Sequence, residues 1–129
     1  ELMAQSHIND KNRWLIPMLD ARRMEVYTAV FDGAGKEIKP TWAEVLFPNS
    51  LGALLENQKA YVFGEGAKKF KTITENENLL FLDNYDFPSA RQMVAMAYEA
   101  FKTKQFEDLA YFEPFYLKEF ISTPPKSKH

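Results

Sequence analysis

The stretch LDARRMEVYTAVF, residues 19–31, decides the fold more than any other part of the chain. Its second half, residues 25–31, is rich in β-branched and aromatic side chains, which is typical of a strand. The apolar segment 14–18 precedes it, and three charged side chains crowd the residues between the two segments: Asp20, Arg22 and Arg23. The sequence therefore predicts a hairpin of two strands joined by a tight, charged turn.

The composition limits the class of protein. The chain has 129 residues, which is enough to build one domain around a single core. Its formal net charge of -2 is unlike the basic footprint of a stand-alone nucleic-acid binder. It contains no cysteine, which excludes disulfides and thiolate chemistry and fits a reducing compartment. No apolar run approaches the roughly 20 residues that span a bilayer.

The histidines argue against metal-dependent hydrolysis. The sequence has two, His7 and His129, at opposite ends of the chain. A zinc protease needs two imidazoles on one helical face, typically in the pattern His-Glu-x-x-His, and a third ligand. That spacing does not occur, so we expect neither a metal nor a cofactor.

After the hairpin, the sequence predicts a turn at residues 32–35 and then a further extended segment. Thr41 and Glu44, three residues apart, are also compatible with a capping box that opens a helix. Pro48 would end such a helix within two turns, so we favour a strand that ends at residues 45–47. Further strands are predicted at residues 59–63 and 79–82.

Helices are predicted at three places. Asn49 or Ser50 would cap a short helix whose stripe is Leu51, Leu54 and Leu55, and another helix would begin at residues 67–70. The clearest spans residues 89–104, with Ser89 and Gln92 as a capping box. Its apolar residues recur at helical spacing: Ala90, Met93, Val94, Ala97, Tyr98 and Phe101. We interpret it as an amphipathic helix docked on the sheet.

The segment 111–120 is dense in aromatic residues but has no helical period, and Pro114 forbids a normal helix interior. Two interpretations stay open: the segment packs back over its own domain, or it presents a surface to a partner. The residues beyond it, 121–129, are rich in proline and lysine and are expected to be disordered.

Three short motifs resemble the TsaB (YeaZ) family. Residues 20–27 (DARRMEVY) are similar to that family's D-A-R-x-x-E-V-Y, and residues 62–66 (VFGEG) are similar to its strand and glycine turn. Residues 113–118 (EPFYLK) resemble its closing E-P-x-Y-L-R, with Lys118 in place of the usual arginine. The motifs follow the order and approximate spacing of the family.

The resemblance implies an α/β fold: one lobe of the actin-like, ribonuclease-H-like type, with a mixed sheet packed with helices. TsaB proteins have two such lobes. Residues 1–129 would form the carboxy-terminal lobe, with the amino-terminal lobe absent from this sequence. Residues 1–5 look like part of the helix that leads into it.

The resemblance also implies a function. TsaB is a non-catalytic subunit in the synthesis of threonylcarbamoyladenosine in tRNA, where TsaD carries the transferase site and TsaE is an ATPase. The expected partners of the full-length protein are TsaD, TsaE and a second copy of itself, in the cytoplasm, with tRNA reached only through the complex. Because the family's pairing surfaces lie mainly on the first lobe, this lobe alone should bind TsaD weakly or not at all. The alternative is a nucleotide-binding or hydrolytic, glycoprotease-like domain on the same fold.

No catalytic residue is expected, and the residues singled out come from the motifs. The hairpin motif contributes Asp20, Ala21, Arg22, Glu25, Val26 and Tyr27, which would be structural or would face a partner. The closing motif contributes Glu113, Pro114, Tyr116, Leu117 and Lys118. Gly64 and Gly66 would form either a degenerate nucleotide turn or simply a tight connection from strand to helix.

Overall fold

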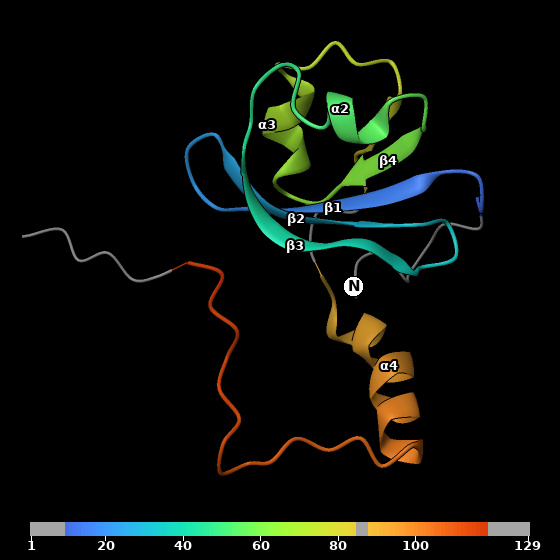
Figure 1. Cartoon of the computed structure of the whole chain (residues 1–129), viewed down its shortest axis with the longest axis vertical. Helices are drawn as coiled ribbons and strands as arrows, with labels where there is room; N and C mark the ends of the chain where they lie inside the picture. The colour runs from blue at the N-terminus through green and yellow to red at the C-terminus, as the bar shows by residue number, and fades with distance from the viewer. Residues whose placement is uncertain (1–9, 85–87, 119–129) are drawn as a thin grey trace, which may run out of the picture.

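The computed structural model describes residues 10–84 and 88–118 of the chain, apart from the side chain of Gln92. Residues 10–84 form one five-stranded sheet in the order β3-β2-β1-β4-β5 (Figure 1). The strands are β1 (Trp14–Asp20), β2 (Glu25–Phe31), β3 (Glu37–Val45), β4 (Ala60–Phe63) and β5 (Leu79–Leu82). The described helices are α2 (Gly52–Leu55), α3 (Ala67–Lys71) and α4 (Ala90–Lys102).

The sheet is mixed, as predicted. β1 pairs with β2, and β2 with β3, in antiparallel fashion, while β1 pairs with β4, and β4 with β5, in parallel. The predicted hairpin is confirmed, with Leu19 opposite Tyr27 and Asp20 opposite Val26. The strands predicted at 59–63 and 79–82 correspond to β4 and β5.

The main core lies between the sheet and the two short helices α2 and α3, which cover one of its faces (Figure 1). Phe70 of α3 is fully buried there, and its ring meets that of Phe81 edge to face at 6.0 Å. The other buried members are Ile16, Met18, Val26, Val30, Leu46, Leu51, Leu55, Ala60, Val62, Ala67 and Leu79. A smaller cluster on the opposite face joins Leu15, Ala29, Phe31 and Phe63. β1 and β4 contribute to both clusters, so both faces of these strands are buried. This explains why their sequences are apolar runs.

The segment between the hairpin and α2 confirms one prediction and corrects another. The turn at residues 32–35 leads into β3, so Thr41 and Glu44 belong to a strand and do not open a helix. The prediction that Asn49 or Ser50 caps the next helix is wrong. Leu51, in a left-handed conformation (φ 66°), occupies the cap position, and Ser50 Oγ instead accepts a hydrogen bond from Phe47 N at 2.9 Å. This geometry is set by the loop that places Leu51 in the core. The usual preference for asparagine or serine at a helix cap does not determine it.

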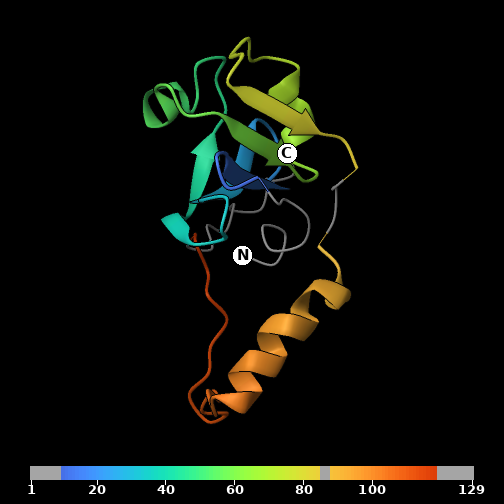
Figure 2. The ribbon, with the colours of Figure 1, turned by 90° about the vertical axis from the view of Figure 1, so that its right-hand side faces the viewer.

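Helix α4 forms where predicted, but the prediction that it docks on the sheet is wrong. Figures 1 and 2 show it standing away from the sheet, and its apolar residues are exposed, with Met93 at 50% and Phe101 at 65%. An amphipathic pattern indicates that a helix has an apolar face but not which surface covers that face. Ser89 Oγ accepts a bond from Arg91 N at 3.3 Å, as an N-cap side chain does.

The aromatic segment after α4 is exposed in its described part. Tyr111, Phe112, Phe115 and Tyr116 all project into solvent, so the prediction that the segment packs back over its own domain is wrong for these residues. The tail predicted at 121–129, the histidines and the entry helix at 1–5 lie outside the described residues. Within the described ranges, we find no helix with the length and hydropathy that a membrane crossing requires.

Candidate functional site

The turn between β1 and β2 holds two consecutive arginines in a backbone conformation that L-residues rarely adopt. Arg22 has φ 68° and Arg23 has φ 48°. The turn is closed by two backbone hydrogen bonds, from Ala21 N to Glu25 O and from Glu25 N to Arg22 O, both at 3.1 Å. Non-glycine residues in this region each cost on the order of 1–3 kcal/mol and persist only where surrounding contacts hold them.

Lys69 of α3 supplies those contacts. Its ammonium group donates to Asp20 Oδ1 at 3.0 Å, to Arg23 O at 2.8 Å and to Glu25 O at 2.5 Å. Asp20 Oδ1 also accepts a bond from Arg22 N at 2.5 Å. These bonds lower the pKa of the Asp20 carboxyl. The hydrogen bond from the Arg22 amide is the largest cause, and the bond from Lys69 is the next. Asp20 therefore binds the backbone amide of Arg22 and the ammonium group of Lys69, which gives it a structural role in the turn.

The guanidinium groups of Arg22 and Arg23 are exposed. No hydrogen bond or ion pair to either of them is found among the residues that the structure describes. A guanidinium group can bind a carboxylate or a phosphate with two parallel hydrogen bonds. The turn thus exposes two guanidinium groups to solvent, and Lys69 holds the backbone that carries them.

The hairpin motif and the closing motif meet. Lys118 Nζ forms an ion pair with Glu25 Oε2, joining positions that are 93 residues apart in the chain. Leu117, Ala21 and Tyr27 are half-buried and Val26 is fully buried, whereas Glu113, Pro114 and Tyr116 are exposed. The structure therefore joins the last residue of the closing motif to a residue within the hairpin motif, a contact that the sequence did not reveal.

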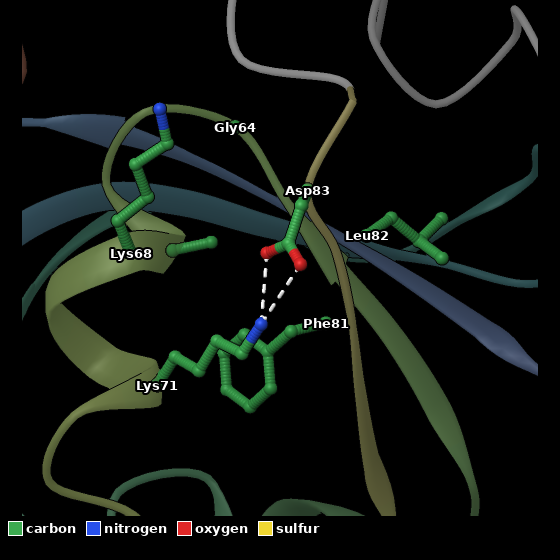
Figure 3. Close-up of a pocket in the computed structure, with 7 residues that line it drawn as sticks. Gly64, Lys68, Lys71, Phe81, Leu82 and Asp83 are labelled. Atoms are coloured by element: carbon green, nitrogen blue, oxygen red, sulfur yellow. Dashed lines mark hydrogen bonds and ion pairs between the residues drawn. The ribbon is translucent and has the colours of Figure 1, made fainter.

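The glycine turn after β4 is a tight connection. Gly66 N donates to Met18 O and Ala67 N donates to Gly64 O, both at 3.0 Å, so these two amides are already engaged within the protein. The depression beside Gly64, crossed by the Lys71–Asp83 ion pair, has a volume of about 10 Å³ (Figure 3). That is room for about one water molecule, whereas small-ligand sites usually measure roughly 300–1,000 Å³.

A larger hollow lies beside β3 and α2, and the sequence did not reveal it. Its volume is about 340 Å³ and it is widely open to solvent. Lys39 Nζ lies 3.7 Å from the centroid of the Trp42 ring, and Trp42 Nε1 donates to Glu44 Oε2 at 2.7 Å. Trp42 is therefore engaged with both charged neighbours on this wall, Lys39 and Glu44.

The described residues include no group of three or more histidine, cysteine, aspartate or glutamate side chains that could hold a metal ion. Lys69 is the residue of the site that sequence reasoning missed. It stands within the run Lys68-Lys69-Phe70-Lys71, and nothing in that run distinguishes the lysine that reaches back to the hairpin.

Comparison with known proteins places the fold. No family model matches the sequence, and no curated protein matches it. A solved structure of an uncharacterized Pseudomonas aeruginosa protein with similarity to the peptidase YeaZ is similar to this chain, with a TM-score of 0.66 and 17% identity. That match covers 91% of this chain and 55% of the other. YeaZ from Pseudomonas aeruginosa matches with a TM-score of 0.51 and 19% identity, over 73% of this chain and 45% of that one.

At these identities the likeness shows the fold. The predicted class, a mixed sheet with helices in the actin-like, ribonuclease-H-like manner of YeaZ, is confirmed. The chain spans about half the length of the solved structures that it matches.

Proposed function

We propose that this chain forms the second lobe of a TsaB (YeaZ)-type protein, which serves as a scaffold subunit for threonylcarbamoyl transfer to tRNA adenosine by TsaD. One observation carries the proposal. Residues 20–27 and 113–118, whose motifs resemble those of TsaB, are joined by the Glu25–Lys118 ion pair, and the sheet has the YeaZ fold. Fold likeness alone would be weak support, because this fold hosts many activities.

The local chemistry supports a non-catalytic role for this lobe. The amides that could approach a phosphate at the glycine turn are bonded to Met18 O and Gly64 O. The charged side chains of the hairpin are arranged to fix a turn and to expose two guanidinium groups. This arrangement suits recognition of a partner better than bond making or breaking. The alternative, a nucleotide-binding or hydrolytic domain, has in its favour that one similar solved structure is described as similar to the peptidase YeaZ.

The partners proposed for the whole protein are TsaD, TsaE and a second copy of the protein, in the cytoplasm, with tRNA bound only through the complex. The described part of this lobe offers exposed surface for such contacts. Large apolar side chains project from α4 and from the segment that follows it, and a monomeric protein rarely leaves so many exposed.

Titration of ATP into the 129-residue chain separates the proposal from its alternative. We expect no measurable binding heat and no rise of the melting temperature with ATP, because the glycine turn has no cavity of nucleotide size. Micromolar affinity for ATP would contradict the scaffold role and favour a nucleotide-binding domain.

A further inference from the structure

The hollow between strand β3 and helix α2 has the size of a small-ligand site. Figure 1 shows the chain leaving the end of β3 toward the layer that contains α2, and side chains of both elements line the hollow. Its volume of about 340 Å³ lies at the lower end of the roughly 300–1,000 Å³ that such sites measure. An indole ring, two charged side chains and several apolar side chains form its wall, and each of these groups indicates part of the chemistry of a ligand.

The indole ring of Trp42 already carries a cation. Lys39 Nζ lies 3.7 Å from the centroid of the ring, and tryptophan is the aromatic side chain that attracts cations most strongly. No hydrogen bond or ion pair of this ammonium group is found within residues 10–84 and 88–118. At a site that is open to solvent such a contact is weak, so the cation of a ligand can displace the lysine from the ring.

Glu44 gives the hollow a negative charge. The residue is half-buried, and its Oε2 accepts a hydrogen bond from Trp42 Nε1 at 2.7 Å. Among the residues that the structure describes, no lysine or arginine forms an ion pair with this carboxylate. A carboxylate that is partly removed from water is stabilised by a cation placed nearby. The hollow therefore favours a positively charged ligand over an anion.

Much of the remaining wall is apolar. The side chains that make it so are Phe47, Leu51, Ala53 and Leu54. Ser50 Oγ, which also lines the hollow, accepts a hydrogen bond from Phe47 N at 2.9 Å and donates one to Val45 O at 3.4 Å, so it is already engaged. A primary ammonium group has three N–H donors to satisfy, whereas a quaternary ammonium group has none and presents methyl groups. This wall therefore suits a quaternary ammonium group.

We propose that this hollow binds a small, free organic cation with a quaternary ammonium group. The ammonium group lies over the face of Trp42 beside the Glu44 carboxylate, and Lys39 competes with it for the ring. Aromatic faces recognise quaternary ammonium ligands such as choline in this way. The hollow shares no residue with the turn between β1 and β2, so the site does not depend on the proposed scaffold role.

Titration of choline into the 129-residue chain tests the site, and the Lys39→Ala variant tests the competition. NMR follows the indole N–H signal of Trp42, with that of Trp14, which lies outside the hollow, as the internal reference. For the wild type we expect a dissociation constant on the order of 1 mM, because so small a ligand makes few contacts. Lys39→Ala should bind choline about two- to fivefold more tightly, since the competing cation is removed.

Lys36→Ala is the matched control, because it removes the same charge from an exposed residue just before β3 that lies outside the hollow. This control should bind choline as the wild type does. Glu44→Gln keeps an acceptor for Trp42 Nε1 but removes the negative charge, so its affinity for choline should fall about threefold or more. Melting curves confirm that each variant is folded.

A neutral ligand separates charge from shape. Neohexyl alcohol has the shape of choline without its charge and should bind at least about fivefold more weakly. Equal binding of the two ligands would overturn the proposal, because the hollow would then be an apolar site without preference for a cation. Weaker binding by Lys39→Ala would also contradict it, since the lysine would then hold the ligand. So would an unchanged Trp42 signal, in the wild type and in Lys39→Ala, up to about 50 mM choline.

Vesicles identify the source of the ammonium group, because phosphatidylcholine carries the same group on a lipid. We expect the protein to stay in the supernatant when phosphatidylcholine vesicles are pelleted. Pelleting with these vesicles, but not with phosphatidylglycerol vesicles, would overturn the assignment to a free cation and favour a lipid headgroup.

Discussion

Replacing Lys69 with methionine is expected to lower the free energy of unfolding by about 3 kcal/mol. Methionine keeps the apolar length of the side chain but removes the ammonium group. That group donates to two backbone carbonyls, Arg23 O and Glu25 O, and charge-assisted bonds of this kind contribute about 1.5–3 kcal/mol each. The side chain is only 17% exposed, so water cannot fully replace these bonds. Urea unfolding measures the loss.

The matched control is Lys71→Met on the same helix. Lys71 pairs with Asp83, but both side chains are largely exposed, so its loss should cost less than about 1 kcal/mol. Equal losses for the two variants would contradict the role given to Lys69.

The cost of the Lys69 substitution should depend on pH. The folded pKa of Asp20 lies below its ordinary value of 3.8, so the stabilisation from its ionised form is fully present above that value. It is lost as the pH falls through the lowered pKa. The stability gap between wild type and Lys69→Met should therefore be constant near neutral pH and should narrow in acid, as melting curves at several pH values would reveal.

Replacing Gly66 with alanine should destabilise the protein by about 2 kcal/mol. Gly66 has φ -67°, which any residue adopts, so the cost is steric and does not come from the backbone. A Cβ at this position would lie 2.7 Å from Val26 Cγ1 and 3.0 Å from the carbonyl carbon of Leu19. The glycine is thus needed because α3 begins against the hairpin, and a bound ligand is not required to explain it.

Gly52→Ala serves as its control. A Cβ there meets nothing within 4 Å, and alanine is favoured over glycine in a helix, so the variant should be as stable as the wild type or more so by up to about 1 kcal/mol. Denaturant unfolding compares the two. A Gly66→Ala variant as stable as the wild type would contradict the close packing of α3 on the hairpin.

Much of the sheet could be predicted from the sequence because its signals are local. The β-branched run at residues 25–31 and the apolar runs before the glycine turn and before Asp83 each correspond to a strand. The position of α4 could not be predicted, because helical periodicity identifies an apolar face without identifying what covers it. The cap of α2 could not be predicted either, since burial of Leu51 overrides the usual capping preference.

The candidate site was predicted only in part. The motifs identified the hairpin turn, but two arginines in the left-handed region have no signal in sequence, where asparagine and glycine are the usual residues. The role of Lys69 depends on the packing of α3 against the turn, which brings together positions 44 and more residues apart. Such a contact follows from the tertiary fold and from no local pattern.

The most direct test of the scaffold role is reconstitution of the tRNA-modifying reaction from purified TsaD, TsaE, tRNA, ATP and an activated threonylcarbamoyl donor, with and without the protein that contains this lobe. The measured quantity is threonylcarbamoyladenosine per tRNA. We expect the modification to depend on TsaD and to rise when the protein is added, although the protein alone produces none. Modification by this protein without TsaD, or no effect of adding it, would contradict a non-catalytic scaffold.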